Sequence, residues 1–266
     1  MEDFNFKKSF GQNFINDKNI IYKIIECSNI KENSLVIEIG PGSGNLTKEL
    51  SKVSKNVLAY ERDDRLEDIL DEKLVGCDNV TIIFQDFLQC DIENDIKEYS
   101  YEHLYLTANI PYYITTPIVE KIIKSKLNFE NITLMMQKEV GERFSARPGS
   151  KSYGSITVFL NYYFDIKKQF EVSRNLFTPR PNVDSVVITL TMKDSRRANN
   201  EELFFKVVRS AFQYKRKNIK NNLKNYDLKV IEEVLKRYNY DLTVRAEQLK
   251  LEAFIDIADE LDKRTK

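Results

Sequence analysis

The chain of 266 residues contains one histidine, three cysteines and no tryptophan. The histidine, His103, stands at the start of an apolar run, where it fits a strand-entry residue better than a catalytic base. Cys27, Cys77 and Cys90 lie far apart without paired spacing, which argues against a disulfide framework and against a zinc site. Catalysis by Ser-His-Asp or Cys-His groups is therefore disfavoured, and we expect no metal in the protein.

Long hydrophobic stretches are also missing from the sequence. No run approaches the roughly 18 apolar residues that are needed to span a bilayer. The N-terminal stretch MEDFNFKKSFGQNF has neither the apolar core nor the small-residue cleavage site of a signal peptide. A hydrophobic content of 42% and a charged content of 31% indicate a globular protein. We therefore expect a cytoplasmic protein with no membrane partner.

An excess of charge of either sign is lacking, because 41 basic side chains balance 41 acidic ones. This balance says little about nucleic acids, since phosphate binding depends on local clusters of cations. Such a cluster occupies residues 205–225, which contain no acidic residue and the following cations: Lys206, Arg209, Lys215, Arg216, Lys217, Lys220 and Lys224. On one helix most of them would share a broad face, which favours RNA binding over a merely solvated surface.

Strand-like and helix-like patterns alternate through the first half of the chain. Segments rich in Val, Ile and Leu predict strands at 34–40, 56–61, 80–86, 103–110 and 131–137. Amphipathic segments predict helices at 45–54, 64–74, 116–127 and 138–146. This order predicts an α/β fold with a Rossmann-like parallel sheet that helices cover on both faces.

The second half of the chain has a different texture. Residues 154–164 and 182–192 are β-branched with no helix signal between them, and they predict an antiparallel pair at one edge of the sheet. The polar stretch 193–202 predicts a linker, and helical patterns follow at 202–223, 227–239 and 245–261. We therefore expect two domains, a sheet domain over 1–194 and a small all-helical domain over 195–266.

A glycine-rich turn follows the first strand of this sheet. Gly40, Gly42 and Gly44 in EIGPGSG let the backbone turn tightly and let a ligand approach closely. The pattern is G-x-G-x-G rather than the G-x-G-x-x-G of dinucleotide binders, so pyrophosphate binding is less favoured. A glycine turn alone is weak evidence, because it is also a common structural loop.

Carboxylates end the next two strands. Glu61 can accept hydrogen bonds from both ribose hydroxyls of an adenosine cofactor, and Asp86 can accept one from an adenine amine. A solvated strand end for Glu61 and a helix cap for Asp86 are the plain alternatives. Ligand-type groups at the same edge of a parallel sheet favour a binding site there, because open α/β sheets bind ligands at that edge.

The stretch Asn109-Ile110-Pro111-Tyr112 ends the fourth strand at the same edge. The Asn109 side chain and the Ile110 carbonyl offer two acceptors for the two hydrogens of one exocyclic amine. Such a pair would make the amine nitrogen nucleophilic without a strong base. Tyr112 offers a ring on which a base can stack. In isolation the stretch would be read as a proline turn with packed aromatics.

Several motifs together resemble those of the S-adenosylmethionine-dependent ribosomal RNA adenine N6-dimethyltransferases. They run in order from about residue 6 to about residue 224: GQNF, EIGPGSG, ERDDRL, QD, NIPY, QKEVGERFSARPGSKSYG and FTPRPNVDS. The family has a small-subunit branch and a large-subunit branch that confers macrolide resistance. TTPI, PGSKSYG and PNVDS resemble the small-subunit branch, whereas the isoleucine in NIPY is more typical of the resistance branch.

The resemblance implies roles for individual residues. Contacts with S-adenosylmethionine are implied for Asn13, Ile15, Gly40, Gly42, Glu61, Asp86 and Asn109. Contacts with the target base are implied for Asn109, Ile110, Pro111, Tyr112 and Phe177, where Phe177 would stack on the second face of the base or else be a core residue. We interpret Arg143, Arg147, Lys151 and Arg180, with Arg209, Lys215, Arg216, Lys217 and Lys220, as RNA contacts.

The resemblance implies dimethylation of two adjacent adenosines in a hairpin near the 3′ end of small-subunit ribosomal RNA. The partner would be this RNA or the assembling small subunit, and the protein would act as a monomer. Three alternatives remain at this point: a large-subunit methyltransferase, a DNA adenine methyltransferase, and an assembly factor whose RNA binding matters more than its chemistry.

Overall fold

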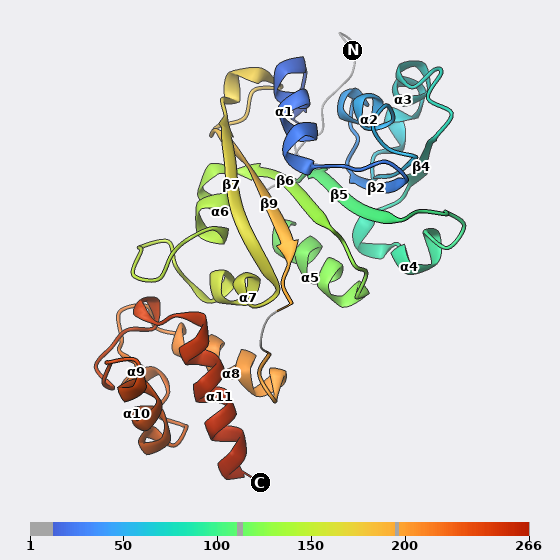
Figure 1. Ribbon diagram of the computed structural model, residues 1–266. Helices are drawn as coiled ribbons and strands as arrows, with labels where there is room; N and C mark the ends of the chain where they lie inside the picture. The colour runs from blue at the N-terminus through green and yellow to red at the C-terminus, as the bar shows by residue number, and fades with distance from the viewer. Residues whose placement is uncertain (1–12, 111–113, 195–196, 266) are drawn as a thin grey trace. The chain divides into compact units, whose positions relative to one another are not determined.

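The computed structural model describes residues 13–110, 114–194 and 197–265 (Figure 1). The chain forms two compact units. The first includes the described residues up to Gly141 together with Ile166–Met192. The second includes Glu142–Asp165 and the chain from Lys193 onward. The expected boundary near residue 195 falls close to Met192, but residues 142–165 belong to the second unit although the sequence placed them in the first domain.

A seven-stranded sheet forms the centre of the first unit, in the order β4-β3-β2-β5-β6-β9-β7. Its strands are β2 (Ser34–Ile39), β3 (Asn56–Glu61), β4 (Val80–Phe84), β5 (His103–Asn109), β6 (Asn131–Gln137), β7 (Phe164–Val172) and β9 (Ser185–Met192). The first five run parallel, and β9 is antiparallel to β6. The predicted α/β class with a mostly parallel sheet is therefore confirmed.

Helices lie on both faces of this sheet (Figure 1). They are α1 (Lys18–Ser28), α2 (Asn45–Leu50), α3 (Glu67–Lys73), α4 (Ile92–Asp95), α5 (Thr115–Ser125) and α6 (Lys138–Phe144), with short 3-10 turns η2 (Asp64–Leu66) and η3 (Phe87–Gln89). On one face, Ile21 and Ile24 of α1 and Leu50 of α2 pack in one core with Val36 and Val57 of the sheet. This burial explains why the strands are nearly continuously apolar.

One predicted strand is wrong. Residues 154–164 were expected to be β, but Ser155–Tyr163 forms helix α7. Seven of the eleven residues are apolar, so the β-branched and aromatic composition favoured a strand, while tertiary packing decides for a helix. Thr157 anchors the first turn, because its Oγ1 accepts a bond from Gly154 N at 3.1 Å and donates one to Arg143 O at 2.7 Å. The neighbour of β9 is instead β7, whose alternating polar residues suit an edge strand.

The second unit is a helical bundle around its own core. Besides α7 it contains α8 (Glu201–Ala211), α9 (Ile219–Asn222), α10 (Leu228–Arg237), the 3-10 turn η5 (Ala246–Gln248) and α11 (Leu251–Thr265). Phe204, Val208, Val234 and Phe254 are fully buried in its core. The helix expected over 202–223 is not continuous, since α8 ends at Ala211 and residues 212–218 form a turn before α9. The basic residues therefore do not share one long helix face. Among the described ranges, no helix is both long and apolar enough to cross a membrane.

A charged cluster ties together the amino ends of the central strands. Glu130 accepts a hydrogen bond from Tyr105 Oη at 3.0 Å, pairs with Lys31 Nζ at 2.8 Å and contacts His103 Nδ1. His103 is the first residue of β5, as expected of a strand-entry residue, and lies at the opposite end of that strand from Asn109. The ammonium of Lys31, followed by the His103 and Tyr105 contacts, lowers the pKa of Glu130 to about 2.

We expect Glu130→Gln to destabilise the fold at neutral pH by about 1 kcal/mol, a value reduced for solvent screening because the Glu130 side chain is 32% exposed. The pKa of Glu130 is lower in the folded than in the unfolded state, so its contribution is present above pH 4.5 and is lost as the pH falls toward 2. Urea unfolding of both proteins at pH 7 and at pH 3 measures this difference. A loss of stability of equal size at both pH values would contradict the ionic contribution.

Candidate cofactor and target-base site

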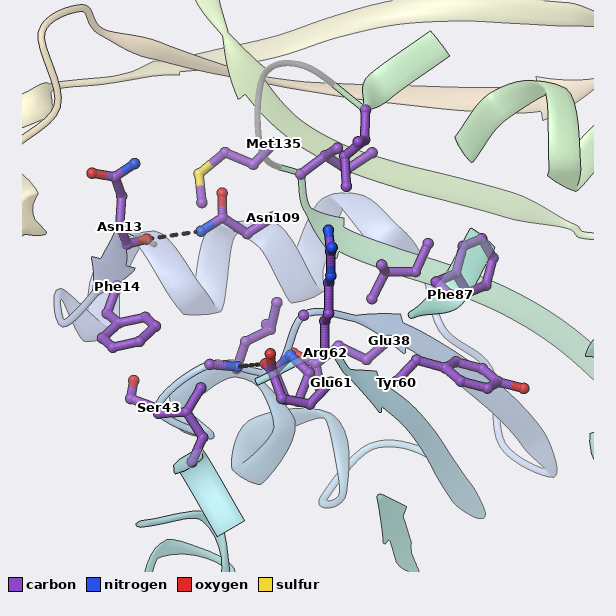
Figure 2. A pocket seen from close by; sticks show the side chains of 18 of the residues that line it. Asn13, Phe14, Glu38, Ser43, Tyr60, Glu61, Arg62, Phe87, Asn109 and Met135 are labelled. Atoms are coloured by element: carbon purple, nitrogen blue, oxygen red, sulfur yellow. Dashed lines mark hydrogen bonds between the residues drawn. The ribbon is translucent and has the colours of Figure 1, made fainter. Parts of the chain in front are cut away.

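A pocket lies at the carboxyl ends of β2, β3, β4 and β5 (Figure 2). β2 and β5 are neighbours in the sheet, and the chain moves outward from them in opposite directions. Such a switch point is where open α/β sheets bind their ligands. Residues expected at this edge from the sequence line the pocket together: Asn13, Ile15, Gly40, Gly42, Glu61, Asp86, Asn109, Ile110 and Phe177. Pro111 and Tyr112 lie outside the described residues.

The glycine turn after β2 forms one wall of the pocket. Gly40 and Gly42 have φ values of 71° and 57°, a region that residues with a side chain rarely adopt. A Cβ atom on Gly42 would lie 2.8 Å from ring carbons of Phe14, so the pocket also needs glycine there for space. Gly40 N donates to Tyr60 O at 2.9 Å, which fixes the turn against the end of β3.

Glu61 closes β3 and binds the same turn. Its Oε2 accepts a hydrogen bond from Gly42 N at 3.1 Å, and its Oε1 accepts one from Asp63 N at 2.9 Å. The carboxylate is buried, which raises its pKa. The backbone of Arg62 is a third hydrogen-bond partner of this carboxylate. A carboxylate has about four acceptor sites, so Glu61 keeps acceptor capacity for a hydroxyl group in the pocket.

Asp86 follows β4 and has two partners. Its Oδ1 accepts a hydrogen bond from Leu88 N at 2.9 Å and caps η3, while its Oδ2 lies 3.6 Å from Arg62 Nε. The helix-cap alternative raised by the sequence is therefore present in the structure. It is compatible with a contact to an adenine amine, because the Oδ2 atom is not used by the cap.

Asn109 is oriented by the segment that precedes α1. Its Nδ2 donates to Asn13 O at 3.1 Å (Figure 2). Its Oδ1 acceptor takes no hydrogen bond from any described residue. The same segment is attached to the glycine turn, since Asn45 Nδ2 donates to Ile15 O at 3.0 Å. The side chain of Asn109 is therefore fixed by the hydrogen bond from its amide nitrogen, and its carbonyl oxygen is available to a ligand.

Phe177 lies on a short strand that pairs with that segment. The short strands β1 (Phe14–Ile15) and β8 (Phe177–Thr178) pair antiparallel, with Ile15 opposite Phe177. Phe177 is 5% exposed and packs in the core around α1, yet it also lines the pocket. Phe177 is therefore a core residue that also lines the pocket, and its stacking on the target base stays a prediction.

Glu38 lines the pocket, although the sequence motif EIGPGSG predicted no role for it. It lies near the end of β2, is 1% exposed, and its Oε2 takes no hydrogen bond from any described residue. Burial raises the pKa of Glu38 to about 8, and the charge of Glu61 adds to this, while the Thr47 hydroxyl acts in the opposite direction. A glutamate directly before the glycine turn was the available signal, because hydrophobic strand ends have no packing reason to carry one.

Lys121 is a second contributor that the sequence did not indicate. From α5, its Nζ donates to Leu88 O at 3.2 Å and to Cys90 O at 2.5 Å. It thereby fixes the loop that follows Asp86. Its spacing on an amphipathic helix looks like that of any surface lysine, so no sequence pattern could have revealed this contact.

The basic residues fall in both units. Arg143, Arg147 and Lys151 belong to the second unit together with Arg209, Lys215, Arg216, Lys217 and Lys220, whereas Arg180 belongs to the first. Lys215 Nζ donates to Lys151 O at 3.0 Å, so two basic loops far apart in sequence are adjacent. Arg209 bonds Phe205 O within its own helix. In the described parts of the chain, no group of three potential metal ligands lies together.

The sheet order, the glycine turn and the acidic strand ends define a Rossmann-like, S-adenosylmethionine-dependent methyltransferase. The chain belongs to the ribosomal RNA adenine dimethylase family, whose model matches residues 3–263.

Individual relatives agree with this assignment. The chain is 48% identical to ribosomal RNA small subunit methyltransferase A of Macrococcus caseolyticus over 82% of this chain and 75% of the relative. The crystal structure of a dimethyladenosine transferase from Plasmodium falciparum matches with a TM-score of 0.79 at 27% identity, covering 95% of this chain and 98% of that one. The 23S rRNA methyltransferase ErmE matches with a TM-score of 0.77 at 27% identity, over 94% and 100% of the two chains.

Proposed function

We propose that this protein uses S-adenosylmethionine to dimethylate the N6 amines of two adjacent adenosines in a hairpin near the 3′ end of small-subunit ribosomal RNA. The observation that carries the proposal is Asn109, whose Nδ2 is fixed by Asn13 O at 3.1 Å. That bond leaves its Oδ1 as a preset acceptor in the lining of a pocket suited to an adenosine cofactor.

The pocket residues fit this cofactor in three respects. Gly40 and Gly42 remove side chains where a ligand would approach, Glu61 has acceptor capacity for ribose hydroxyls, and Glu38 has a buried oxygen without a partner in the described chain. Asp86 and the loop fixed by Lys121 would hold the adenine. When bound, S-adenosylmethionine supplies an electrophilic methyl group.

The target adenine would be held by acceptors that face its amine. Asn109 Oδ1 and the carbonyl of Ile110 would accept the two N6 hydrogens and so direct the nitrogen lone pair toward the methyl group. Phe177 would stack on one face of the base, and Tyr112 on the other. An adenosine inside a duplex cannot reach such a pocket, so the nucleotide must leave its stack. Positioning supplies most of the acceleration in this scheme.

The small-subunit substrate is preferred because of the relatives. The identity of 48% is to a small subunit methyltransferase, whereas the 23S rRNA enzyme is 27% identical. Contacts with the RNA are assigned to the exposed cations of the second unit, above all Arg147, Lys151, Lys215, Arg216 and Lys217, with Arg143, Lys220 and Arg209 beside them, and to Arg180 of the first unit. Cation clusters of this kind supply the phosphate contacts of RNA-binding proteins.

The function is tested by mass spectrometry of ribosomal RNA from a strain that lacks the protein. We expect both dimethyladenosines near the 3′ end of the small-subunit RNA to be absent and to return when the gene is restored. Loss of a modified adenosine from the large-subunit RNA, with the small-subunit RNA unchanged, would contradict the proposed substrate.

A further inference from the structure

The turn between α8 and α9 presents an aromatic ring among cations. Tyr214, Lys215, Arg216 and Lys217 are all exposed. Tyr214 is 58% exposed, more than any other aromatic side chain in the described parts of the chain. A bulky ring that gains nothing from burial in the folded chain is a candidate contact for a partner.

Hydrogen bonds from the buried side chain of Asn222 fix the backbone of this turn. Asn222 is 8% exposed, and its Nδ2 donates to Ala211 O at 2.7 Å, Tyr214 O at 3.2 Å and Lys217 O at 3.3 Å. Its Oδ1 accepts a bond from Tyr214 N at 3.2 Å, so one buried side chain fixes both ends of the turn. A further bond joins Lys217 N to Tyr214 O at 2.9 Å. The backbone is therefore preorganised, and a partner does not have to order it.

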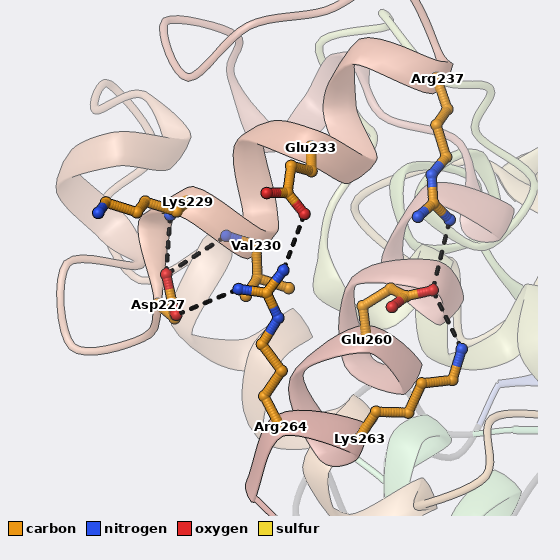
Figure 3. A network of polar contacts seen from close by, with 8 residues as sticks. All are labelled: Asp227, Lys229, Val230, Glu233, Arg237, Glu260, Lys263 and Arg264. Atoms are coloured by element: carbon orange, nitrogen blue, oxygen red, sulfur yellow. Dashed lines mark hydrogen bonds and ion pairs between the residues drawn. The ribbon is translucent and has the colours of Figure 1, made fainter.

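The cations of the turn differ from those between α10 and α11. Between α10 and α11, Arg264 pairs with Glu233 at 2.9 Å, and Arg237 and Lys263 pair with Glu260 at 3.5 and 3.1 Å (Figure 3). Lys215, Arg216 and Lys217 form no ion pair with any described residue. Their charge is not compensated locally, which suits a polyanionic partner.

A second basic loop lies beside the turn. Lys215 Nζ donates to Lys151 O at 3.0 Å, and Gly149 N donates to Glu247 O at 2.6 Å, so the loop around Arg147 and Lys151 is held in place. The exposed ring of Tyr214 thus belongs to a surface with cations on two adjacent loops. Cations alone can bind phosphates anywhere along an RNA duplex. An aromatic ring among the cations adds a site on which an unstacked base can bind.

We propose that Tyr214 stacks on an unpaired base of the RNA substrate while Lys215, Arg216 and Lys217 bind the neighbouring phosphates. The proposal rests on the proposed function for the identity of the RNA. Through Tyr214 the helical unit would distinguish an unpaired RNA loop from a duplex, because a paired base offers no free face for stacking.

The absence of tryptophan from the chain permits a direct test. The Tyr214→Trp variant carries a single indole, whose fluorescence is quenched when it stacks on a base. We expect quenching by a small-subunit 3′-terminal hairpin that retains its unpaired loop, and none by a fully paired RNA of equal length. Tyr22→Trp is the matched control, because Tyr22 is 50% exposed on α1 and lies outside the basic surface.

Salt dependence separates stacking from phosphate contact. We measure how tightly the protein binds small subunits that were isolated from a strain lacking it. The salt concentration is varied on the order of 50 to 300 mM, the range in which phosphate contacts weaken. We expect Tyr214→Ala to weaken binding about 5- to 150-fold with an unchanged salt slope. Arg216→Ala should reduce the slope by about 0.7 to 0.9. Tyr214→Phe should bind like the wild type.

Three results would overturn the stacking role. The first is that Tyr214→Ala binds small subunits with wild-type affinity. The second is that paired and unpaired RNA quench the fluorescence of Tyr214→Trp equally. The third is that subunit protein still quenches this fluorescence after the RNA has been digested, which would indicate a protein partner instead. Failure of the proposed function is recognised separately, because the small-subunit RNA of the deletion strain would then keep its dimethyladenosines whatever Tyr214 does.

Discussion

Asn109→Ala is expected to lower the rate of methyl transfer about 10²- to 10³-fold, the range seen when one preset polar group is removed from a reacting centre. The substitution removes the Oδ1 acceptor proposed for the N6 amine and the Nδ2 bond to Asn13 O. Single-turnover transfer of labelled methyl groups to immature small subunits measures the rate. Binding to the same subunits should be preserved, because the cations assigned to RNA contact are untouched.

Two further variants show which half of the amide matters. Asn109→Asp keeps an acceptor but replaces the donor to Asn13 O by a second acceptor, so it should also be slow if orientation is required. Asn94→Ala is the matched control, since Asn94 is an exposed residue of α4 away from the pocket. Near wild-type transfer by Asn109→Ala would show that the amine is not activated by this side chain.

The positions of the parallel strands along the chain could be predicted because their signals are local. Each of the segments 34–40, 56–61, 80–86, 103–110 and 131–137 is apolar, short and bounded by turn residues, and all became strands within about two residues of the expected ends. Residues 154–164 could not be assigned in this way. Their composition suits either structure, and the choice depends on burial of Val158 and Tyr162 in a core that residues distant in sequence supply.

The residues of the candidate site likewise fall into those that local sequence patterns predicted and those that only the fold reveals. Gly40, Glu61, Asp86 and Asn109 were predicted to meet because the carboxyl ends of parallel strands share one edge. The roles of Lys121 and Asn222 depend on contacts with backbone carbonyls, which no residue pattern encodes. The composition of the sequence revealed the basic cluster. Only the structure shows that part of the cluster lies on a turn fixed by Asn222 rather than along one helix.

Binding of the cationic cofactor is expected to release a proton through Glu38. The carboxyl has a pKa of about 8 in the free protein, so it is mostly protonated at pH 7. Its Oε2 has no partner in the described chain, and a positive group in the pocket would favour the ionised form. The other titratable groups of the pocket are Glu61, Tyr60, Arg62 and Asp86, and Glu61 already accepts hydrogen bonds from the backbone of Gly42, Asp63 and Arg62.

The sign of the pH dependence follows from this pKa. Below pH 8 the cofactor must displace a proton from Glu38, so its affinity should fall up to tenfold for each unit of decreasing pH, or about 1.4 kcal/mol. Above pH 8 the carboxylate is already ionised, and Glu38 contributes no further slope. Glu38→Gln should lack this slope and bind S-adenosylmethionine about 10- to 100-fold more weakly at pH 8, because the buried counter-charge is gone.

Calorimetry in phosphate and in Tris at pH 7 measures the proton directly, since the two buffers differ in ionisation enthalpy. The amino group of the cofactor also titrates near this pH, with a pKa of about 7.7 to 8.0 for α-amino groups. The quantity to compare is therefore the difference between the wild type and Glu38→Gln, in which the cofactor's own titration cancels. An equal proton release in both proteins would mean that Glu38 stays protonated in the complex and that its buried oxygen serves a neutral contact.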